Sequence, residues 1–131
     1  MIVRSFEELG VWKLSRKFAE SVYGITSIDP LARDFSLRDQ LRRSSGSVMD
    51  NIAEGFERHG RKEFIQFLYI AKASCGESRS QIYRAKDAKY LEDREFELLK
   101  NKAEAISRSL SNFINYLKKS EYTGLKHKAD F

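Results

Sequence analysis

Apolar residues recur every three or four positions in four stretches of the chain, and short polar breaks separate these stretches. Such spacing places the apolar side chains on one side of an α-helix, whereas a half-buried β-strand shows them at every second position. The stretches predict helices over residues 5–25, 36–56, 61–88 and 93–119. Four helices joined by short or moderate loops predict an all-α fold, an antiparallel up-and-down four-helix bundle.

Each predicted helix has an apolar stripe that we expect to face the core. The expected stripes are Val11, Leu14, Phe18, Val22 and Ile25 in the first helix; Leu37, Leu41, Ser44, Val48, Ile52 and Gly55 in the second; Phe64, Phe67, Leu68, Ala71, Cys75, Ile82 and Ala85 in the third; and Phe96, Leu99, Ala103, Ile106, Leu110, Phe113, Ile114 and Leu117 in the fourth.

Capping residues mark where the helices are expected to begin and end. Residues 5–8 read Ser-Phe-Glu-Glu, a capping box, so we expect Ser5 to begin the first helix. Ser36 and Asp93 are the expected N-caps of the second and fourth helices. Gly60 is free to take the left-handed conformation that ends a helix, so we expect it to end the second helix.

The length of 131 residues fits one domain, which we expect to be a bundle over residues 1–119 followed by a flexible polar tail over 120–131. Charged residues make up 33% of the chain, and no apolar run approaches the roughly 20 residues of a membrane-spanning helix. The first residues also lack the apolar stretch of a signal peptide. These features predict a cytoplasmic protein with no membrane partner.

Three of the predicted helices carry more apolar residues than one core face needs. From this surplus we expect an interface between copies of the chain, with Trp12, Met49, Tyr69 and Tyr83 in it. The alternative is that the long helices curve and a broad core buries the extra residues. The surplus set is Leu9, Trp12, Ala19 and Tyr23; Ser45, Met49, Ala53 and Phe56; and Ile65, Tyr69, Gly76 and Tyr83.

The chain carries a net charge of +5, which makes a polyanion such as RNA or DNA a plausible partner. The densest basic cluster is Arg38, Arg42, Arg43, Arg58, Arg61 and Lys62. We expect this cluster to bind nucleic acid without strong sequence specificity, because the sequence shows no motif for base-specific recognition. The alternative is that these side chains pair with carboxylates, as Asp39 and Arg43 would at four-residue spacing.

Residues that carry catalysis or hold metals are sparse. The chain has two histidines and one cysteine, Cys75, and its seven glycines never form a phosphate-binding loop. Glu54 and Glu77 resemble a paired carboxylate, but no histidine accompanies them as in a bundle metal site. The sequence therefore predicts no catalytic residue, metal or cofactor, and a protein that is not an enzyme.

A run in the second predicted helix resembles a known family signature. Residues 40–56 read QLRRSSGSVMDNIAEGF, which is similar to the signature of the 23S rRNA-intervening sequence proteins. Residues 63–77 also match that family's following helix, and residues 6–13 match its opening, so the resemblance covers about residues 5–118. It implies an up-and-down bundle that assembles as a homopentameric ring. The chain is also similar to accessory proteins of diversity-generating retroelements, and this resemblance implies nucleic-acid binding.

The signature also contains polar and small residues that we interpret as structural. Ser47, Asn51 and Glu54 lie along one flank of the core stripe, where buried polar groups need partners. We expect Asn51 and Glu54 to anchor the break after the second helix or to bind an arginine across the bundle, and Gly55 to allow two helices to approach closely. Glu77 is the corresponding polar residue of the next helix. The alternative function is a protein-interaction scaffold with no nucleic-acid role.

Overall fold

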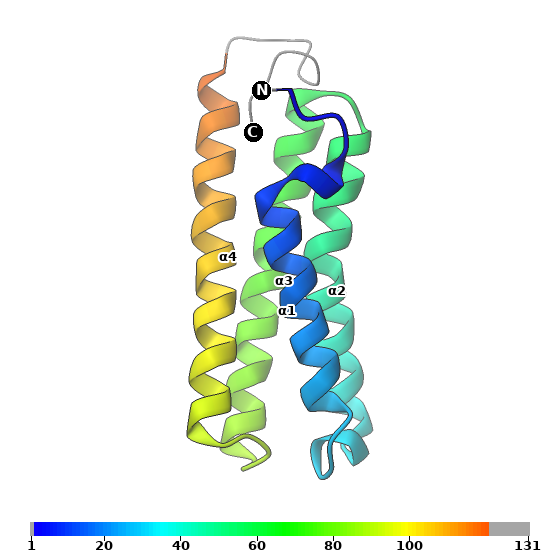
Figure 1. Ribbon diagram of the computed structural model, residues 1–131, viewed down its shortest axis with the longest axis vertical. Coiled ribbons are helices and arrows are strands. Elements are labelled where there is room, and N and C mark those ends of the chain that lie inside the picture. The colour runs from blue at the N-terminus through cyan, green and yellow to red at the C-terminus, as the bar shows by residue number, and fades with distance from the viewer. Residues whose placement is uncertain (1, 121–131) are drawn as a thin grey trace.

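The computed structural model describes residues 2–120, and within that range it contains helices and no strand. Four long helices stand side by side along the long axis of the molecule (Figure 1). They are α1 (Gly10–Thr26), α2 (Phe35–Glu57), α3 (Arg61–Asp87) and α4 (Asp93–Lys119), with short 3-10 helices at Phe6–Glu8 and Leu31–Arg33. The all-α prediction is therefore confirmed.

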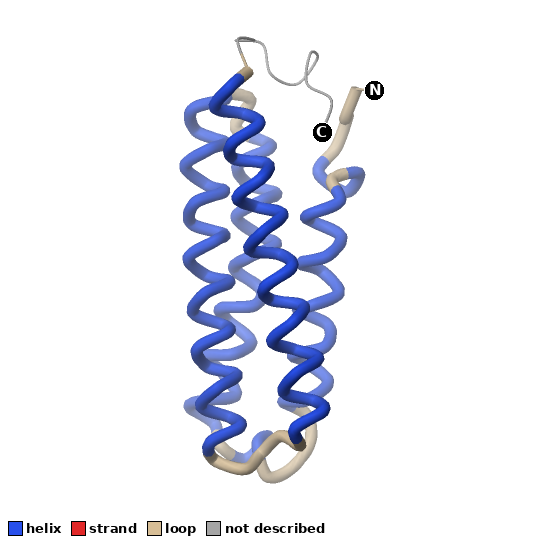
Figure 2. The backbone as a smooth tube through the Cα atoms, turned by 90° about the vertical axis from the view of Figure 1, so that its left-hand side faces the viewer, coloured by secondary structure: helices blue, strands red, loops and turns tan. Residues whose placement is uncertain are grey.

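Successive helices run in opposite directions and pack as neighbours around the bundle. α2 packs against α1 and α3, and α4 packs against α3 and α1. Figure 2 shows the α1–α2 and α3–α4 connections at one end and the α2–α3 turn at the other. This arrangement confirms the antiparallel up-and-down four-helix bundle. None of the described helices is both long enough and apolar enough to span a bilayer.

The predicted core stripes of α2, α3 and α4 are buried, with two exceptions. Phe67 of α3 and Phe113 of α4 are only partly buried. The other members are buried, and all of them except Ser44 and Gly55 form one continuous hydrophobic cluster with Val11, Phe18 and Val22 of α1. Helical periodicity therefore located most of the core of these three helices.

The expected stripe of α1 is wrong at Leu14, which is 44% exposed. The buried face of α1 runs between the two apolar stripes that the sequence shows and takes Ala19 from the second. Tyr23, at the outer edge of the second stripe, is 54% exposed. Leu9, Ser45 and Phe56 are also buried in the single chain, so a broad core absorbs part of the apolar surplus.

The first helix begins five residues later than predicted. Residues 6–8 form a 3-10 turn, and the Ser5 side chain makes no capping hydrogen bond. Leu9 then takes an extended backbone conformation, and α1 begins at Gly10. Val3 and Leu9 are both buried. Burying these two side chains bends the chain over the end of the bundle and overrides the local capping signal.

Two further N-cap predictions are wrong by one or two residues. Asp34, not Ser36, caps α2, because its Oδ1 accepts a hydrogen bond from the Leu37 backbone N–H at 3.1 Å. The Ser36 hydroxyl instead accepts one from the Gln40 side chain at 2.9 Å. Glu92, not Asp93, caps α4, and it forms a capping box with Glu95.

Gly60 does not take the left-handed conformation that we expected. Its φ is −117° and its backbone is extended, because it serves as the N-cap of α3. His59 takes the left-handed conformation instead, with φ of 67°. Three residues separate α2 from α3, so the position after the C-cap Arg58 must end one helix while Gly60 begins the next.

Candidate nucleic-acid-binding surface

The six predicted phosphate-binding residues fall into two groups at opposite ends of α2. Arg38, Arg42 and Arg43 lie near its beginning, and Arg58, Arg61 and Lys62 surround the α2–α3 turn. Arg42 and Arg58 are separated by about 24 Å along the helix at 1.5 Å per residue. Figure 1 shows the beginning of α2 and the α2–α3 turn at opposite ends of the bundle. The structure therefore does not gather the six residues into one cluster.

Arg42 joins α2 to the end of α1. Its Nε donates to Thr26 Oγ1 at 2.8 Å, and its Nη2 donates to Ser27 Oγ at 3.1 Å. Its guanidinium also stacks over the Tyr23 ring at 4.5 Å. A positive charge beside a helix C-terminus is stabilising, because it interacts favourably with the helix dipole. Arg42 therefore acts mainly in holding two helices together.

Arg38 and Arg43 differ in how free their charges are. Arg38 Nε donates to Asp39 Oδ1 at 2.9 Å, and Arg38 Nη1 donates to the Ala32 carbonyl at 3.2 Å. The hydrogen bond from Arg38 lowers the pKa of Asp39, and the nearby charges of Arg42 and Arg43 act in the same direction. The expected pair of Asp39 with Arg43 is therefore replaced by a pair with Arg38. Arg43 is exposed.

The group around the α2–α3 turn is also largely engaged. Arg58 Nη2 lies 3.1 Å from Glu54 Oε2, and Arg58 Nη1 lies 3.7 Å from Glu63 Oε2. Arg61 Nη1 donates to the Leu117 carbonyl at 3.3 Å and to the Ser120 carbonyl. Arg61 therefore caps the C-terminus of α4, whereas Arg42 binds the Thr26 and Ser27 hydroxyls at the end of α1. Lys62 is exposed.

The signature residues of α2 form a polar seam with α3. Ser47 Oγ and Ser74 Oγ lie 2.9 Å apart, and Asn51 Nδ2 donates to the Ser47 carbonyl and hydroxyl at 2.8 and 2.9 Å. Ser44 Oγ lies 2.7 Å from Ser78 Oγ and donates to Gln81 Oε1 at 2.7 Å. Within residues 2–120, every buried side-chain nitrogen and oxygen has a hydrogen-bond partner.

Glu54 and Glu77 have different partners and do not form a carboxylate pair. Glu54 binds Arg58 one turn later on its own helix, not an arginine across the bundle, and Glu77 Oε2 accepts a bond from Gln81 at 3.4 Å. Among the described residues, no three His, Cys, Asp or Glu side chains are placed to hold a metal ion.

Gly55 marks a close contact between α2 and α3. A Cβ atom at Gly55 would lie 2.6 Å from Phe67 Cβ and 3.0 Å from Phe64 Cδ1. Such separations are too short for non-bonded carbon atoms. The prediction that Gly55 allows two helices to approach closely is consistent with this geometry.

The four predicted interface residues differ in exposure. Trp12 and Met49 are partly buried in the single chain, and the Trp12 ring packs edge-on against Phe6 at 5.1 Å. Tyr69 and Tyr83 of α3 are each 45% exposed. Lys118 stacks over Tyr69 at 5.2 Å, and Tyr83 packs on Phe96 at 4.9 Å, so both tyrosines lie on the side of α3 that faces α4.

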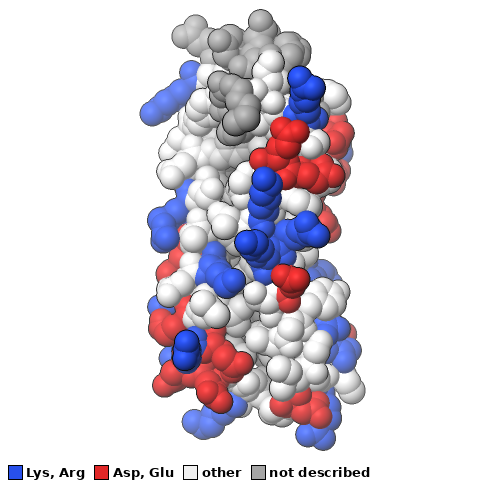
Figure 3. Space-filling model, viewed as in Figure 1, with Lys and Arg blue, Asp and Glu red and all other residues white. Residues whose placement is uncertain are grey.

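One basic group on α1 was missed by reasoning from the sequence. Lys13, Arg16 and Lys17 are exposed and line a shallow depression of about 450 Å³ together with Trp12, Glu7 and Glu20. Their three- and four-residue spacing, which places them on one helix face, was the available signal. Figure 3 shows Lys and Arg side chains gathered across the middle of one face of the bundle.

Comparison with known proteins agrees with the fold and the α2 signature. The family described as 23S rRNA-intervening sequence protein matches residues 7–112. The chain belongs to this family. The match covers all of α1, α2 and α3 and most of α4, so the family resemblance seen in the sequence is confirmed.

A solved protein from the S23 ribosomal protein family has the same fold. It is a protein of unknown function from Bacteroides thetaiotaomicron, 24% identical in sequence, with a TM-score of 0.73. The similarity covers 79% of this chain and 97% of that one. No curated protein matches this 23S rRNA-intervening sequence family member.

The thiol of Cys75 is expected to be unreactive in the folded protein. Cys75 is 1% exposed, its Sγ donates to the Ala103 carbonyl at 3.1 Å, and burial raises its pKa to about 11. At pH 8 we expect the folded chain to react with a thiol reagent at least about 100-fold more slowly than the urea-unfolded chain, because the thiolate is the reacting species. Equal rates would contradict this prediction.

The same raised pKa predicts a pH dependence of stability. The unfolded chain releases the Cys75 proton near the usual thiol pKa of 9.0, whereas the folded chain retains it until about pH 11. The Cys75 contribution to the free energy of unfolding therefore falls as pH rises through this window.

Proposed function

We propose that this protein is a non-enzymatic, self-associating four-helix bundle that binds RNA or DNA through a basic surface without strong sequence specificity. The observation that carries the proposal is the exposed basic face of α1, where Lys13, Arg16 and Lys17 surround Trp12. The Arg16 guanidinium lies 5.8 Å from the centre of the Trp12 ring. Exposed Arg43 and Lys62 add two further cations.

A basic face of this kind binds a phosphate backbone by displacing its counterions. Glu7 and Glu20 line the same depression and limit its positive potential. Self-association increases binding, because several copies of one weak basic face contact one long polyanion at a high effective concentration.

A salt titration of binding to structured RNA and to duplex DNA tests the proposal. We expect affinity to fall steeply with salt, with a log–log slope of about −0.9 per contacted phosphate on duplex DNA. Replacing Lys13, Arg16 and Lys17 with glutamine is expected to make the slope shallower by about one unit for each lost contact. Changing the base sequence is expected to alter affinity little.

A charge-matched control variant replaces Arg33, Lys89 and Arg94 with glutamine, because these exposed residues lie away from the α1 face. We expect this control to keep most of the wild-type salt slope. No binding at about 50 mM salt would refute the proposal, because electrostatic binding is strong under that condition. An equal loss in both variants would indicate a general charge effect and no site on α1.

Self-association is proposed as a homo-oligomer, with five subunits as the family resemblance implies. The support within the chain is that Tyr69 and Tyr83 leave nearly half of their surfaces exposed on one side of α3. Tyr69→Glu is expected to shift the sedimentation coefficient towards the monomer and leave helical circular dichroism unchanged, because a charge is costly to desolvate at an interface.

Ile28→Glu is the control for this experiment, because Ile28 is 61% exposed and lies in the loop after α1. We expect Ile28→Glu to retain the wild-type oligomeric state. A wild-type monomer at tens of micromolar in sedimentation equilibrium would contradict the proposed self-association.

The alternative function is a protein-interaction scaffold. Exposed apolar side chains away from the basic α1 face favour it, since Phe35 is 61% exposed and Leu98 is 58% exposed. Retention of a protein partner after nuclease treatment, combined with no salt-dependent nucleic-acid binding, would support the scaffold over the nucleic-acid-binding function.

A further inference from the structure

The chain around the start of α1 forms the depression that contains the Trp12 ring. Leu9 is extended and buried, so the 3-10 turn of residues 6–8 folds back against the first turns of α1. The Phe6 ring of that turn packs edge-on against Trp12, with ring centroids 5.1 Å apart and an interplanar angle of 63°. This contact holds the Trp12 ring in one orientation at the surface.

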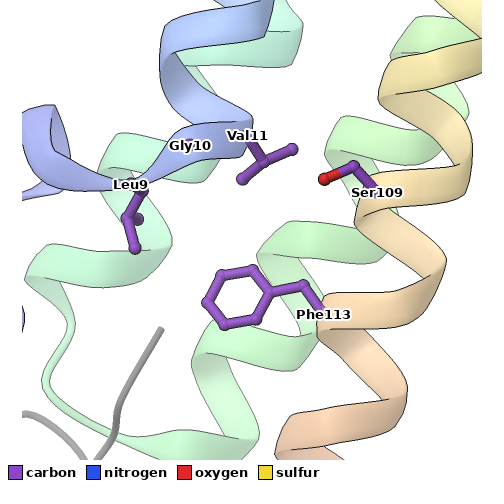
Figure 4. Close-up of a pocket in the computed structure, with 5 residues that line it drawn as sticks. All are labelled: Leu9, Gly10, Val11, Ser109 and Phe113. Carbon is purple, nitrogen blue, oxygen red and sulfur yellow. The ribbon is translucent and has the colours of Figure 1, made fainter. Parts of the chain in front are cut away.

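The depression lies on the outer side of α1, away from α4. Figure 4 shows the Val11 side chain on the inner side, pointing from α1 toward Ser109 of α4. At 3.6 residues per turn, the positions of Trp12, Arg16 and Lys17 lie about 100–240° around the helix from Val11. The depression shares no lining residue with the pocket between α1 and α4, so it is a separate site.

The depression has the size of a small-molecule site and a lining of mixed charge. Its volume of about 450 Å³ lies within the roughly 300–1,000 Å³ of such sites. Within residues 2–120, none of the charged side chains that line it takes part in an ion pair. Three cations and two carboxylates are therefore available to a ligand. These exposed side chains are Lys13, Arg16, Lys17, Glu7 and Glu20.

This lining suits an unpaired nucleotide better than a row of phosphates. Glu7 and Glu20 repel phosphate groups that come close to them. An unpaired nucleotide presents a phosphate to the cations, and the N–H groups at the edge of its base can donate to the carboxylates. The face of the base can stack on the Trp12 ring, and such stacking tolerates any base because every base has a π-face.

The Arg16 side chain is free to leave the Trp12 ring when a base arrives. Its guanidinium lies 5.8 Å from the ring centre, which is a looser stack than the 4.5 Å between Arg42 and Tyr23. Arg42 is also held by two hydroxyl groups, whereas Arg16 is exposed. Exposed side chains change rotamer within picoseconds to nanoseconds. Arg16 can therefore turn from the ring to a phosphate of the bound strand.

We propose that this depression binds an unpaired nucleotide of single-stranded RNA or DNA, with the base stacked on Trp12 and the phosphate beside the three cations. The inference rests on the proposed nucleic-acid-binding function and names the form of nucleic acid that the basic α1 face takes. The cations supply the salt-dependent part of the affinity, and the Trp12 ring supplies a part that depends on the presence of a base.

Intrinsic fluorescence tests the stacking directly, because Trp12 is the only tryptophan of the chain. The two probes are single-stranded oligothymidylate and an abasic strand of the same length, which carries the same phosphates without bases. We expect oligothymidylate to quench Trp12 fluorescence and to bind about tenfold more tightly than the abasic strand, since that factor corresponds to the stacking of one base. The abasic strand is expected to bind and to leave the fluorescence unchanged.

Two substitutions of Trp12 separate stacking from phosphate contacts. Trp12→Leu is expected to lower the affinity for oligothymidylate about tenfold, to that of the abasic strand, because the stacking surface is lost. The slope of log affinity against log salt is expected to stay unchanged, because the phosphate contacts remain. Trp12→Phe keeps a ring and is expected to retain most of the affinity. Circular dichroism checks that both variants are folded.

Tyr23→Leu is the matched control for the loss of an aromatic ring. Tyr23 is 54% exposed, lies on the same helix and also has an arginine over its ring. It lies about 16 Å further along α1 than Trp12, outside the depression. We expect Tyr23→Leu to bind oligothymidylate with the wild-type affinity.

The outcomes separate this inference from the proposed function. Salt-dependent binding of both strands with equal affinity and unchanged Trp12 fluorescence would overturn the inference and leave the proposed function intact. No binding of either strand at about 50 mM salt would overturn both. Wild-type affinity in folded Trp12→Leu would also overturn the inference. The comparison of the two strands uses the wild-type chain, so it does not depend on the folding of a variant.

Two further outcomes would identify a different occupant of the depression. A change in Trp12 emission on dilution without nucleic acid would overturn the inference in favour of a second copy of the chain. Equal quenching by thymidine monophosphate and by oligothymidylate at the same nucleotide concentration would overturn a strand in favour of a free nucleotide. Stronger quenching by the strand is the expected result, because neighbouring phosphates raise its affinity.

Discussion

Phe64→Ala is expected to lower the free energy of unfolding by about 3–5 kcal/mol, the largest effect of a single substitution that we predict. Phe64 is 1% exposed and lies in the first turns of α3. Its ring packs edge-on against Phe56 of α2 at 5.9 Å and against Phe113 of α4 at 5.4 Å. Truncation removes contacts that three helices share and leaves a cavity that they cannot close.

Urea denaturation monitored by circular dichroism measures this loss. Ile70→Ala on the same helix is the control, because Ile70 is 48% exposed and its truncation leaves no enclosed cavity. We expect Ile70→Ala to change the free energy of unfolding by less than about 1 kcal/mol. A loss of less than about 1 kcal/mol for Phe64→Ala would show that this end of the bundle is loosely packed.

Gly55→Ala is expected to destabilise the protein, although alanine normally favours a helix. The new Cβ would lie 2.6 Å from Phe67 Cβ, an atom fixed by the α3 backbone, so α2 and α3 must move apart. Overpacking of this kind costs about 1–3 kcal/mol. The expected result in thermal or urea unfolding is a lower midpoint than that of the wild type.

Gly46→Ala in the same helix is the matched control for the glycine substitution. A Cβ at Gly46 meets no atom within 4 Å, so alanine should stabilise α2 by up to about 1 kcal/mol through its higher helix propensity. The two variants share the same chemical change and differ in their surroundings. If both were stabilising, the close approach of α2 and α3 at Gly55 would be refuted.

Basic residues that lie close together in the sequence do not form one basic surface in the folded protein. Arg42 and Arg43 are neighbours in the chain, yet Arg42 turns towards the end of α1 and Arg43 is exposed to solvent. A sequence window records the density of charge and not the direction in which each side chain points on a helix. Lys13, Arg16 and Lys17 are no denser in sequence, but all three lie on an exposed face.

The helix ends show a similar difference between local signals and packing. Residues 5–8 have the composition of a capping box, but burial of Val3 and Leu9 delays α1 to Gly10. Asp34 caps α2 and also accepts a hydrogen bond at 2.9 Å from the Tyr90 hydroxyl, which belongs to the α3–α4 connection. A contact over 56 residues of sequence cannot be read from a four-residue motif.

The sequence by itself determined the four helices, their order and the buried face of α2, α3 and α4. It did so because a period of 3.6 residues places apolar side chains on one face whatever the neighbouring helices are. The α2 signature also indicated the family, which the match over residues 7–112 confirms.

The tertiary structure alone decided which charges remain free, where α1 begins and which apolar residues stay exposed. Each of these depends on a neighbour distant in sequence: Arg61 is engaged because α4 ends beside it, and Leu14 is exposed because the core takes the face between the two stripes of α1. Side-chain partners and burial are properties of packed pairs of helices, and a single helix pattern specifies only one member of each pair.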